Sequence, residues 1–288
     1  MIKTSAKAAS VVFEGITKVY GKDVVAVNDV NLTVAAGRLV TLLGPSGCGK
    51  TTTLRMIAGL EMATTGRILI GNKDVTTLPA TDRDVSMVFQ SYALFPHMTV
   101  LENVSYGLKF SGCSKAETSE RAHAGLSLVG LDGYDRRLPS ELSGGQQQRV
   151  AVARALVLEP QVLLFDEPLS NLDAKLRRQV REEIREIQQN LGLTVVYVTH
   201  DQEEALAVSD EIVVMRNAEI AQIGPPRDLY ERPFDSFVAD FIGDANLVDA
   251  EVLRIEDDDA VVRIGSVESR HPHRKVRPGP TRVAIRPE

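Results

Sequence analysis

The chain has 288 residues, 43% of them hydrophobic and 25% charged, which is ordinary for a soluble globular protein with one large domain or two smaller ones. Its formal net charge of −6 does not favour wholesale binding to nucleic acid through a basic surface. The two cysteines suggest no disulfide framework, the first ten residues lack the apolar segment of a secretory signal, and no apolar run approaches the roughly 18 residues that cross a bilayer. These features predict a cytosolic protein, unless something else holds it at a membrane.

The first part of the chain is predicted to form strands around a glycine-rich loop. Residues 11–34 alternate between apolar and polar, with a turn at YGKD, which favours antiparallel strands. The apolar stretch RLVTLLG predicts a buried strand, and a helix is expected from Thr51 to Ala58 with Gly59 as its stop. Further strands are expected in ATTGRILIGNKDVTTL and in DVSMVFQ.

The loop GPSGCGKT matches the pattern G-x-x-x-x-G-K-T between a strand and a helix, the context that a phosphate-binding loop requires. Glycines let backbone N–H groups turn inward around phosphate oxygens, and the helix start adds free N–H groups. Lys50 is expected to neutralise the β- and γ-phosphates, and Thr51 to offer its hydroxyl to Mg²⁺. The predicted nucleotide-binding residues here are Gly44, Pro45, Ser46, Gly47, Cys48, Gly49, Lys50, Thr51 and Thr52. Cys48 is interpreted as a small loop residue without chemistry of its own.

Helical patterns dominate from Ser91 to about Pro160, and two apolar strands follow that end in polar residues. VLLFDEP places Asp166 where a parallel strand ends, as expected of a residue that meets Mg²⁺ directly or through water. Glu167 follows, where a carboxylate can polarise an attacking water. TVVYVTH ends in His200; a lone histidine is more often structural, but this position favours a hydrogen bond to the γ-phosphate or the water. Gln90, also at a strand end, is expected to meet the metal or the water, with an ordinary polar loop residue as the alternative.

Two further helices are predicted between and after these strands. Apolar residues from Leu172 to Leu191 recur every three or four positions, with Gly192 as the stop. Asp201 and Glu204 form a capping-box pattern for a helix through Ala207.

The stretch LSGGQQQR is a second glycine-rich helix start. Ser143 is predicted as an N-cap, and Gln146 completes a capping-box pattern. Gly144 and Gly145 are expected to leave the helix start bare of side chains, so that it can lie flush against a phosphate. Because GPSGCGKT already occupies one side of the nucleotide, we predict that this start covers the γ-phosphate bound by a second copy, in a two-fold dimer with two such sites.

GPSGCGKT, Gln90, LSGGQ, VLLFDE, SNLD and His200 follow one another in an order that resembles the ATPase subunit of ABC transporters, over about residues 11–243. The resemblance implies an α/β P-loop NTPase: a RecA-like core, an antiparallel β-subdomain and an inserted helical subdomain at about 91–160. It further implies that Tyr20 stacks under adenine, with a packed core tyrosine as the alternative, and that Asp173 bridges to the partner copy. The implied catalytic residues are Glu167 as base, His200, Gln90 and Lys50; the implied metal site is Thr51, Gln90 and Asp166; and Ser143, Gly144, Gly145 and Gln146 complete the ATP site.

Within that family, SYALFPHMTVLENVSYGL and the region beyond Asn246 are similar to importer ATPases of the sugar, polyamine and ferric-ion group. Residues 1–243 are then the ATPase domain, and 244–288 are part of an OB-like transport-associated domain, since relatives usually continue beyond AIRPE. The implied protein hydrolyses ATP at the cytoplasmic face of the bacterial inner membrane. Its implied partners are a second copy, two integral-membrane permease subunits and, indirectly, a periplasmic solute-binding protein. Ferric ion is the first cargo considered, then polyamine or putrescine, then sugar or phosphonate.

Other functions remain possible on the sequence alone. A non-transport ABC ATPase of DNA repair is disfavoured because no long coiled coil is present, and one of translation because there is a single cassette. A P-loop kinase leaves LSGGQ unexplained. The motifs by themselves also allow export, which the C-terminal region disfavours.

Overall fold

The computed structural model describes residues 8–243, 245–272 and 276–286. Two compact units divide the chain, Met1–Ile223 and Gly224–Glu288. The predicted domain boundary after Gly243 falls inside the second unit, and Asp244, the first residue of the predicted second domain, lies outside the described residues. That boundary stays a prediction.

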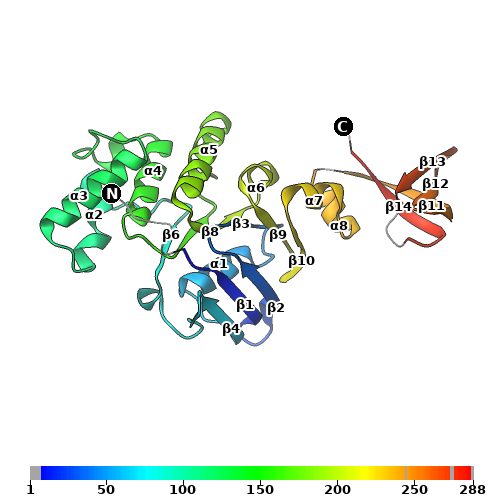
Figure 1. The fold of residues 1–288 in the computed structure, drawn as a ribbon, viewed down its shortest axis with the longest axis horizontal. Helices are drawn as coiled ribbons and strands as arrows, with labels where there is room; N and C mark the ends of the chain where they lie inside the picture. Colours follow the sequence, from blue (N-terminus) through cyan, green and yellow to red (C-terminus); the bar gives the residue numbers. More distant parts are fainter. Residues whose placement is uncertain (1–7, 244, 273–275, 287–288) are drawn as a thin grey trace. The chain divides into compact units, whose positions relative to one another are not determined.

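A six-stranded sheet forms the centre of the first unit (Figure 1), with the order β10-β9-β3-β8-β7-β6. The strands from β9 to β6 pair in parallel, and every residue of β3, β7 and β8 is buried, as expected for strands covered on both faces. Leu43 of β3 pairs with Thr199 of β8, and Val198 pairs with Asp166 of β7, so these three strands end side by side. The bounds are β3 (Leu39–Leu43), β6 (Val85–Val88), β7 (Val162–Asp166), β8 (Thr194–Thr199), β9 (Glu211–Arg216) and β10 (Glu219–Gly224).

The predicted antiparallel strands form a second sheet with the order β2-β1-β4-β5. One apolar cluster joins Phe13 of β1, Ile68 of β4, Leu54 and Ile57 of helix α1 (Lys50–Ala58), and Val196 of β8. Helix α1 therefore shares its core with both sheets, which fixes the loop that precedes it. The bounds are β1 (Val11–Tyr20), β2 (Val24–Val34), β4 (Thr65–Ile70) and β5 (Lys73–Asp74).

Helices fill the chain between β6 and β7, within the predicted helical region 91–160 (Figure 1, green). They are α2 (Val100–Ser105), α3 (Lys115–Leu128) and α4 (Gly144–Leu156), with 3₁₀ turns at Gly107–Phe110 and Pro139–Glu141. Helix α4 also packs against β6 and α5 (Ala174–Leu191), so it connects the helical region to the core sheet.

Two helix starts differ from the sequence pattern. Helix α5 begins at Ala174 rather than near Leu172, because the Asp173 side chain accepts from the Leu176 N–H and acts as the N-cap. Asp201 caps α6 (Gln202–Val208) as predicted, but the capping box with Glu204 is wrong: the Glu204 carboxylate is buried and accepts from the Thr199 hydroxyl at 2.7 Å.

The second unit contains α7 (Pro226–Glu231), α8 (Ser236–Phe241) and an antiparallel sheet with the order β13-β12-β11-β14. This confirms the predicted C-terminal β-region, although an OB fold has five strands and the described residues supply four. Asp257 and Asp258 form the turn between β11 and β12. The bounds are β11 (Asn246–Glu256), β12 (Asp259–Ile264), β13 (Val267–Pro272) and β14 (Gly279–Ile285). Across the ranges 8–243, 245–272 and 276–286, no helix has the length and apolar character to cross a bilayer.

Candidate functional site

The glycine-rich loop joins the end of β3 to the start of α1, and two of its glycines are required by the backbone packing. A Cβ on Gly44 would lie 2.3 Å from the Met215 carbonyl oxygen. Gly49 has φ 105°, and a Cβ there would lie 2.4 Å from the Ala26 carbonyl oxygen. Gly49 is the N-cap of α1 and has no side chain, so the first-turn N–H groups of this helix are left for an anion.

Lys50 is held inside this loop. Its ammonium donates to the Gly44 carbonyl at 2.7 Å and to the Pro45 carbonyl at 2.9 Å, and the residue is only 5% exposed. Burial raises the pKa of the neighbouring Cys48 thiol, which keeps it neutral near pH 7, as suits a passive loop residue. The loop therefore fixes a single positive charge beside its own N–H groups.

Thr51 and Asp166 bring two oxygen atoms together from the loop and from the end of β7. The Thr51 Oγ1 donates to Asp166 Oδ1 over 3.4 Å, a long hydrogen bond. Burial raises the pKa of Asp166, against the lowering effect of the Arg55 charge. A hydroxyl and a carboxylate in this position are the donors that Mg²⁺ prefers, so the residues present fit that ion.

Glu167 and His200 meet beyond the ends of β7 and β8. The His200 Nδ1 lies 3.1 Å from Glu167 Oε2, within hydrogen-bond distance. Glu167 has φ 45°, in the left-handed region, and its N–H donates to the Val198 carbonyl at 3.0 Å. A carboxylate oriented by an imidazole is an arrangement that can remove a proton from a water molecule.

Gln90 is connected to the segment that follows Glu167. Its side-chain amide donates to the Ser170 hydroxyl at 3.1 Å, and that hydroxyl donates to the Glu167 carbonyl at 3.1 Å. The Asn171 side chain donates to the Gln90 carbonyl at 3.0 Å. SNLD was noted in the sequence as a motif, but Ser170 and Asn171 were assigned no role. Both contact Gln90, which lies 80 and 81 positions earlier, and contacts between residues so far apart leave no local pattern in the sequence.

The second glycine-rich helix start forms the predicted capping box. The Ser143 N–H donates to Gln146 Oε1 at 2.9 Å, and the Gln146 N–H donates to Ser143 Oγ at 3.4 Å. The expectation that this helix start is bare and can lie against a phosphate stays a prediction. The structure adds that Gly145 is buried: a Cβ there would lie 2.9 Å from Leu176 Cδ1 of α5. A Cβ on Gly144 would lie 3.1 Å from Leu172 Cδ2. The two glycines therefore also allow α5 and the segment just before it to pack against α4.

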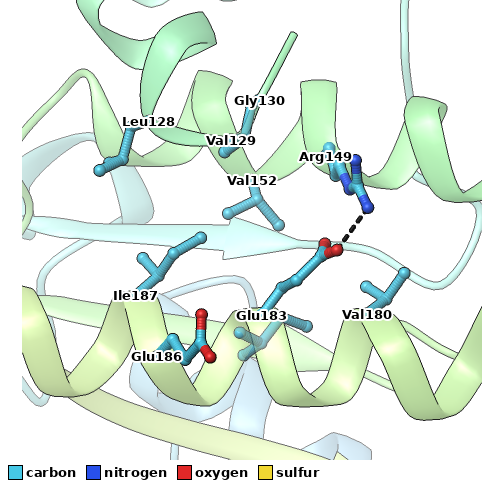
Figure 2. A pocket seen from close by; sticks show the side chains of 10 residues that line it. Leu128, Val129, Gly130, Arg149, Val152, Val180, Glu183, Glu186 and Ile187 are labelled. Atoms are coloured by element: carbon cyan, nitrogen blue, oxygen red, sulfur yellow. Dashed lines mark hydrogen bonds and ion pairs between the residues drawn. The ribbon is translucent and has the colours of Figure 1, made fainter.

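An ion pair also joins helices α4 and α5. Figure 2 shows Arg149 of α4 pointing toward Glu183 of α5, with which it forms a hydrogen-bonded ion pair in the lining of a cavity of about 230 Å³. Gly145 and Arg149 thus contact α5, and Gly144 contacts Leu172 just before α5, all within the same chain, whereas the contacts of Lys50 are with its own loop.

The family model described as "ABC transporter" matches residues 27–170, half of the chain. This chain belongs to the ABC transporter family. The Fe(3+) ions import ATP-binding protein FbpC of Brucella abortus (strain 2308) is 66% identical over 284 residues, covering 99% of this chain and 80% of that protein. The FbpC of Agrobacterium fabrum (strain C58) is 65% identical over 281 residues, covering 98% and 79% respectively.

Solved structures agree with this assignment. The ATP-binding cassette MJ0796, in a dimeric post-hydrolysis state bound to ADP and Pi, is 34% identical with a TM-score of 0.66, over 75% of this chain and 99% of that one. CbiO1 of Clostridium perfringens, part of the ABC transporter complex cbiONQ, is 28% identical with a TM-score of 0.72, over 77% and 90%. The P-loop NTPase fold and the ABC-type ATPase class, both expected from the sequence, are confirmed.

Tyr20 is the remaining residue implied by the resemblance to this family. It ends β1, is 38% exposed, and has the Lys18 ammonium 4.7 Å from its ring centroid. A ring this exposed does not match the alternative of a packed core tyrosine. Its stacking under adenine stays a prediction.

Proposed function

We propose that this chain is the ATP-hydrolysing subunit of a bacterial import system whose cargo is ferric ion. The cargo assignment is supported by identity of 64–66% to proteins named for Fe(3+) import, over nearly the whole chain. Hydrolysis is supported by one observation above all: the Glu167–His200 contact at 3.1 Å, at a sheet edge that also carries the phosphate loop.

ATP binding is assigned to the loop Gly44–Thr52, with Tyr20 under the base. Lys50 neutralises phosphate charge, Glu167 accepts a proton from the attacking water, and His200 orients Glu167 or that water. Thr51, Asp166 and Gln90 are assigned to Mg²⁺, which when bound would neutralise charge on the phosphates. The products are ADP and phosphate, with the proton of the water left on Glu167 before its release to solvent.

The second half of the ATP site is assigned to another copy of the chain. Ser143, Gly144, Gly145 and Gln146 of that copy would cover the γ-phosphate held by Lys50, and Asp173 would bridge between the copies. Ser143 is exposed and uses its side chain as an N-cap, so its helix start presents a polar, dipole-positive end to the outside. The dimeric state described for MJ0796 supports the same arrangement.

Two permease subunits are the proposed membrane partners, which would hold the chain at the cytoplasmic face of the inner membrane. A groove of about 450 Å³ lies beside Gln90, lined by Met87, Phe89, Phe95 and Tyr106 among others. The Phe95 and Tyr106 rings pack in a tilted arrangement, with their centroids 4.5 Å apart, and offer an apolar surface for a helix from such a subunit. Binding of such a helix in the groove would be transmitted to the ATP site through Gln90. The proposed domains are residues 1–243 and 244–288.

Cargo and partners are tested together by uptake of radiolabelled ferric ion in a bacterium that lacks its own copy of this gene. The wild-type chain should restore uptake and should co-purify with a membrane protein of several spans, whereas Glu167→Gln should co-purify but not restore uptake. Restored uptake of putrescine, a sugar or a phosphonate, with ferric uptake unchanged, would overturn the cargo assignment. Co-purification with ribosomes or DNA instead would overturn the transport function.

A further inference from the structure

Arg177 lies in the first turn of α5 and reaches two segments that both adjoin the proposed catalytic pair. One is Ser170–Asp173, which follows Glu167 and leads into α5. The other is the start of α6, which follows His200. Arg177 and Asp201, at the start of α6, are 24 positions apart in sequence, so only the fold brings them together.

Toward α6, the guanidinium contacts two carboxylates. Its Nη1 donates to Asp201 Oδ2 at 3.1 Å, and its Nε lies 3.8 Å from Glu204 Oε1. Asp201 is also the N-cap of α6, and its own N–H donates to the Thr199 hydroxyl at 3.0 Å. That hydroxyl donates to the buried carboxylate of Glu204 at 2.7 Å. Residues on both sides of His200 are therefore fixed by one hydrogen-bonded group that includes Arg177.

Toward the other segment, Arg177 Nη2 donates to the Leu172 carbonyl at 3.2 Å, and the Arg177 N–H donates to the Asp173 carbonyl at 2.8 Å. Ser170, two residues before Leu172, donates to the Glu167 carbonyl. The contacts thus close a ring that runs from Glu167 through His200 and Asp201 to Arg177, and back through Leu172 and Ser170.

We propose that Arg177 is a positioning residue: it holds His200 against Glu167 through Asp201, and it couples that pair to the segment Ser170–Asp173. The planar guanidinium suits this task because its separate N–H groups bond the Leu172 carbonyl and the Asp201 carboxylate at once, which a single ammonium does poorly. The proposal rests on the proposed ATPase function. A small displacement of a catalytic group lowers the rate of the chemical step. Loss of the Arg177 guanidinium contacts should therefore lower kcat rather than weaken ATP binding.

The test uses the full chain and three measurements: steady-state ATP hydrolysis, thermal unfolding, and NMR of protein labelled with ¹³C-histidine. The His200 ring resonance is assigned by its loss in His200→Ala. The test variant is Arg177→Met, and the matched control is Arg178→Met, which removes the neighbouring exposed pair with Glu182. Asp201→Asn is a second test variant, because asparagine keeps the N-cap of α6 while it weakens the charge partner of Arg177.

We expect Arg177→Met to lower kcat by roughly tenfold or more, with KM for ATP within about twofold of wild type, and to move the His200 resonance. Asp201→Asn should change both quantities in the same direction, and Arg178→Met should change neither. If either test variant unfolds, the other carries the test. Wild-type kcat, or a lowered kcat with an unmoved His200 resonance, would overturn the proposal. Full turnover in Glu167→Gln would instead exclude Glu167 as the base, and absence of ATP hydrolysis by the wild-type chain would overturn the proposed function, which keeps these failures distinguishable.

Discussion

The His200 Nδ1 lies 3.1 Å from Glu167 Oε2 because β7 and β8 are adjacent parallel strands in a fixed register. Asp166 pairs with Val198, so one residue beyond the first and two beyond the second reach the same point of the sheet edge. A contact between residues 33 positions apart is thereby set by strand pairing, which places a candidate base and its orienting group together.

This pair gives the first prediction. Glu167→Gln removes the proton acceptor but keeps the size of the side chain, so turnover should fall by about 10²–10⁴-fold while ATP still binds. Phosphate release and binding of a fluorescent nucleotide analogue measure the two quantities. Turnover close to wild type would exclude Glu167 as the base.

The proposed two-chain site gives the second prediction. Ser143→Arg should abolish turnover without weakening ATP binding to the loop around Lys50, because the long cation obstructs the surface that faces the other copy. Ser143→Thr is the matched control, since threonine keeps the N-cap and should keep most of the activity. Turnover per chain should also rise with protein concentration; a strictly monomeric preparation at full activity would disprove the arrangement.

The packing of α4 against α5 gives the third prediction. Gly145→Ala places a Cβ 2.9 Å from Leu176 Cδ1, which should cost about 1–3 kcal/mol in the free energy of unfolding. In a Leu176→Ala background the same substitution should be neutral or slightly stabilising, because the contact is gone and alanine favours helix more than glycine. Urea unfolding of the four proteins measures this; equal costs in both backgrounds would mean that Leu176 is not the obstacle.

Asp210 gives the fourth prediction, on pH. Burial raises its pKa, but hydrogen bonds from Arg185 and the Leu39 N–H outweigh that effect, so the pKa of Asp210 lies below its ordinary value. A lowered pKa contributes stability that is present above the unfolded value near 4 and is lost as pH falls through the folded value.

Asp210→Asn should therefore cost roughly 2 kcal/mol at pH 7, and its deficit should shrink as pH falls below about 4. Thermal unfolding between pH 7 and 3 measures the difference. A deficit that does not change with pH would show that the charge of Asp210 is not what stabilises this contact.

Local sequence patterns predicted the parts of the site that depend on interactions between residues close together in the chain. Strands such as Val162–Asp166 are fully apolar until a polar residue ends them, and the Ser143 and Gln146 spacing encodes its own capping box. Arg177 and Ser170 carry no such signal, because Asp201 and Gln90, which they contact across the site, are distant from them in sequence. Glu204 misled the prediction since its spacing from Asp201 fits a cap equally well; burial under β8 decides instead.

The left-handed backbone conformation of Glu167 has a consequence for attempts to raise the thermal stability of this enzyme. A non-glycine residue at φ 45° costs roughly 1–2 kcal/mol, which the surrounding contacts must offset. Glycine there would relieve that conformational penalty and would also delete the carboxylate. Selection for heat resistance alone should therefore drift toward inert variants at this position, so that durability and catalysis oppose each other at a single residue.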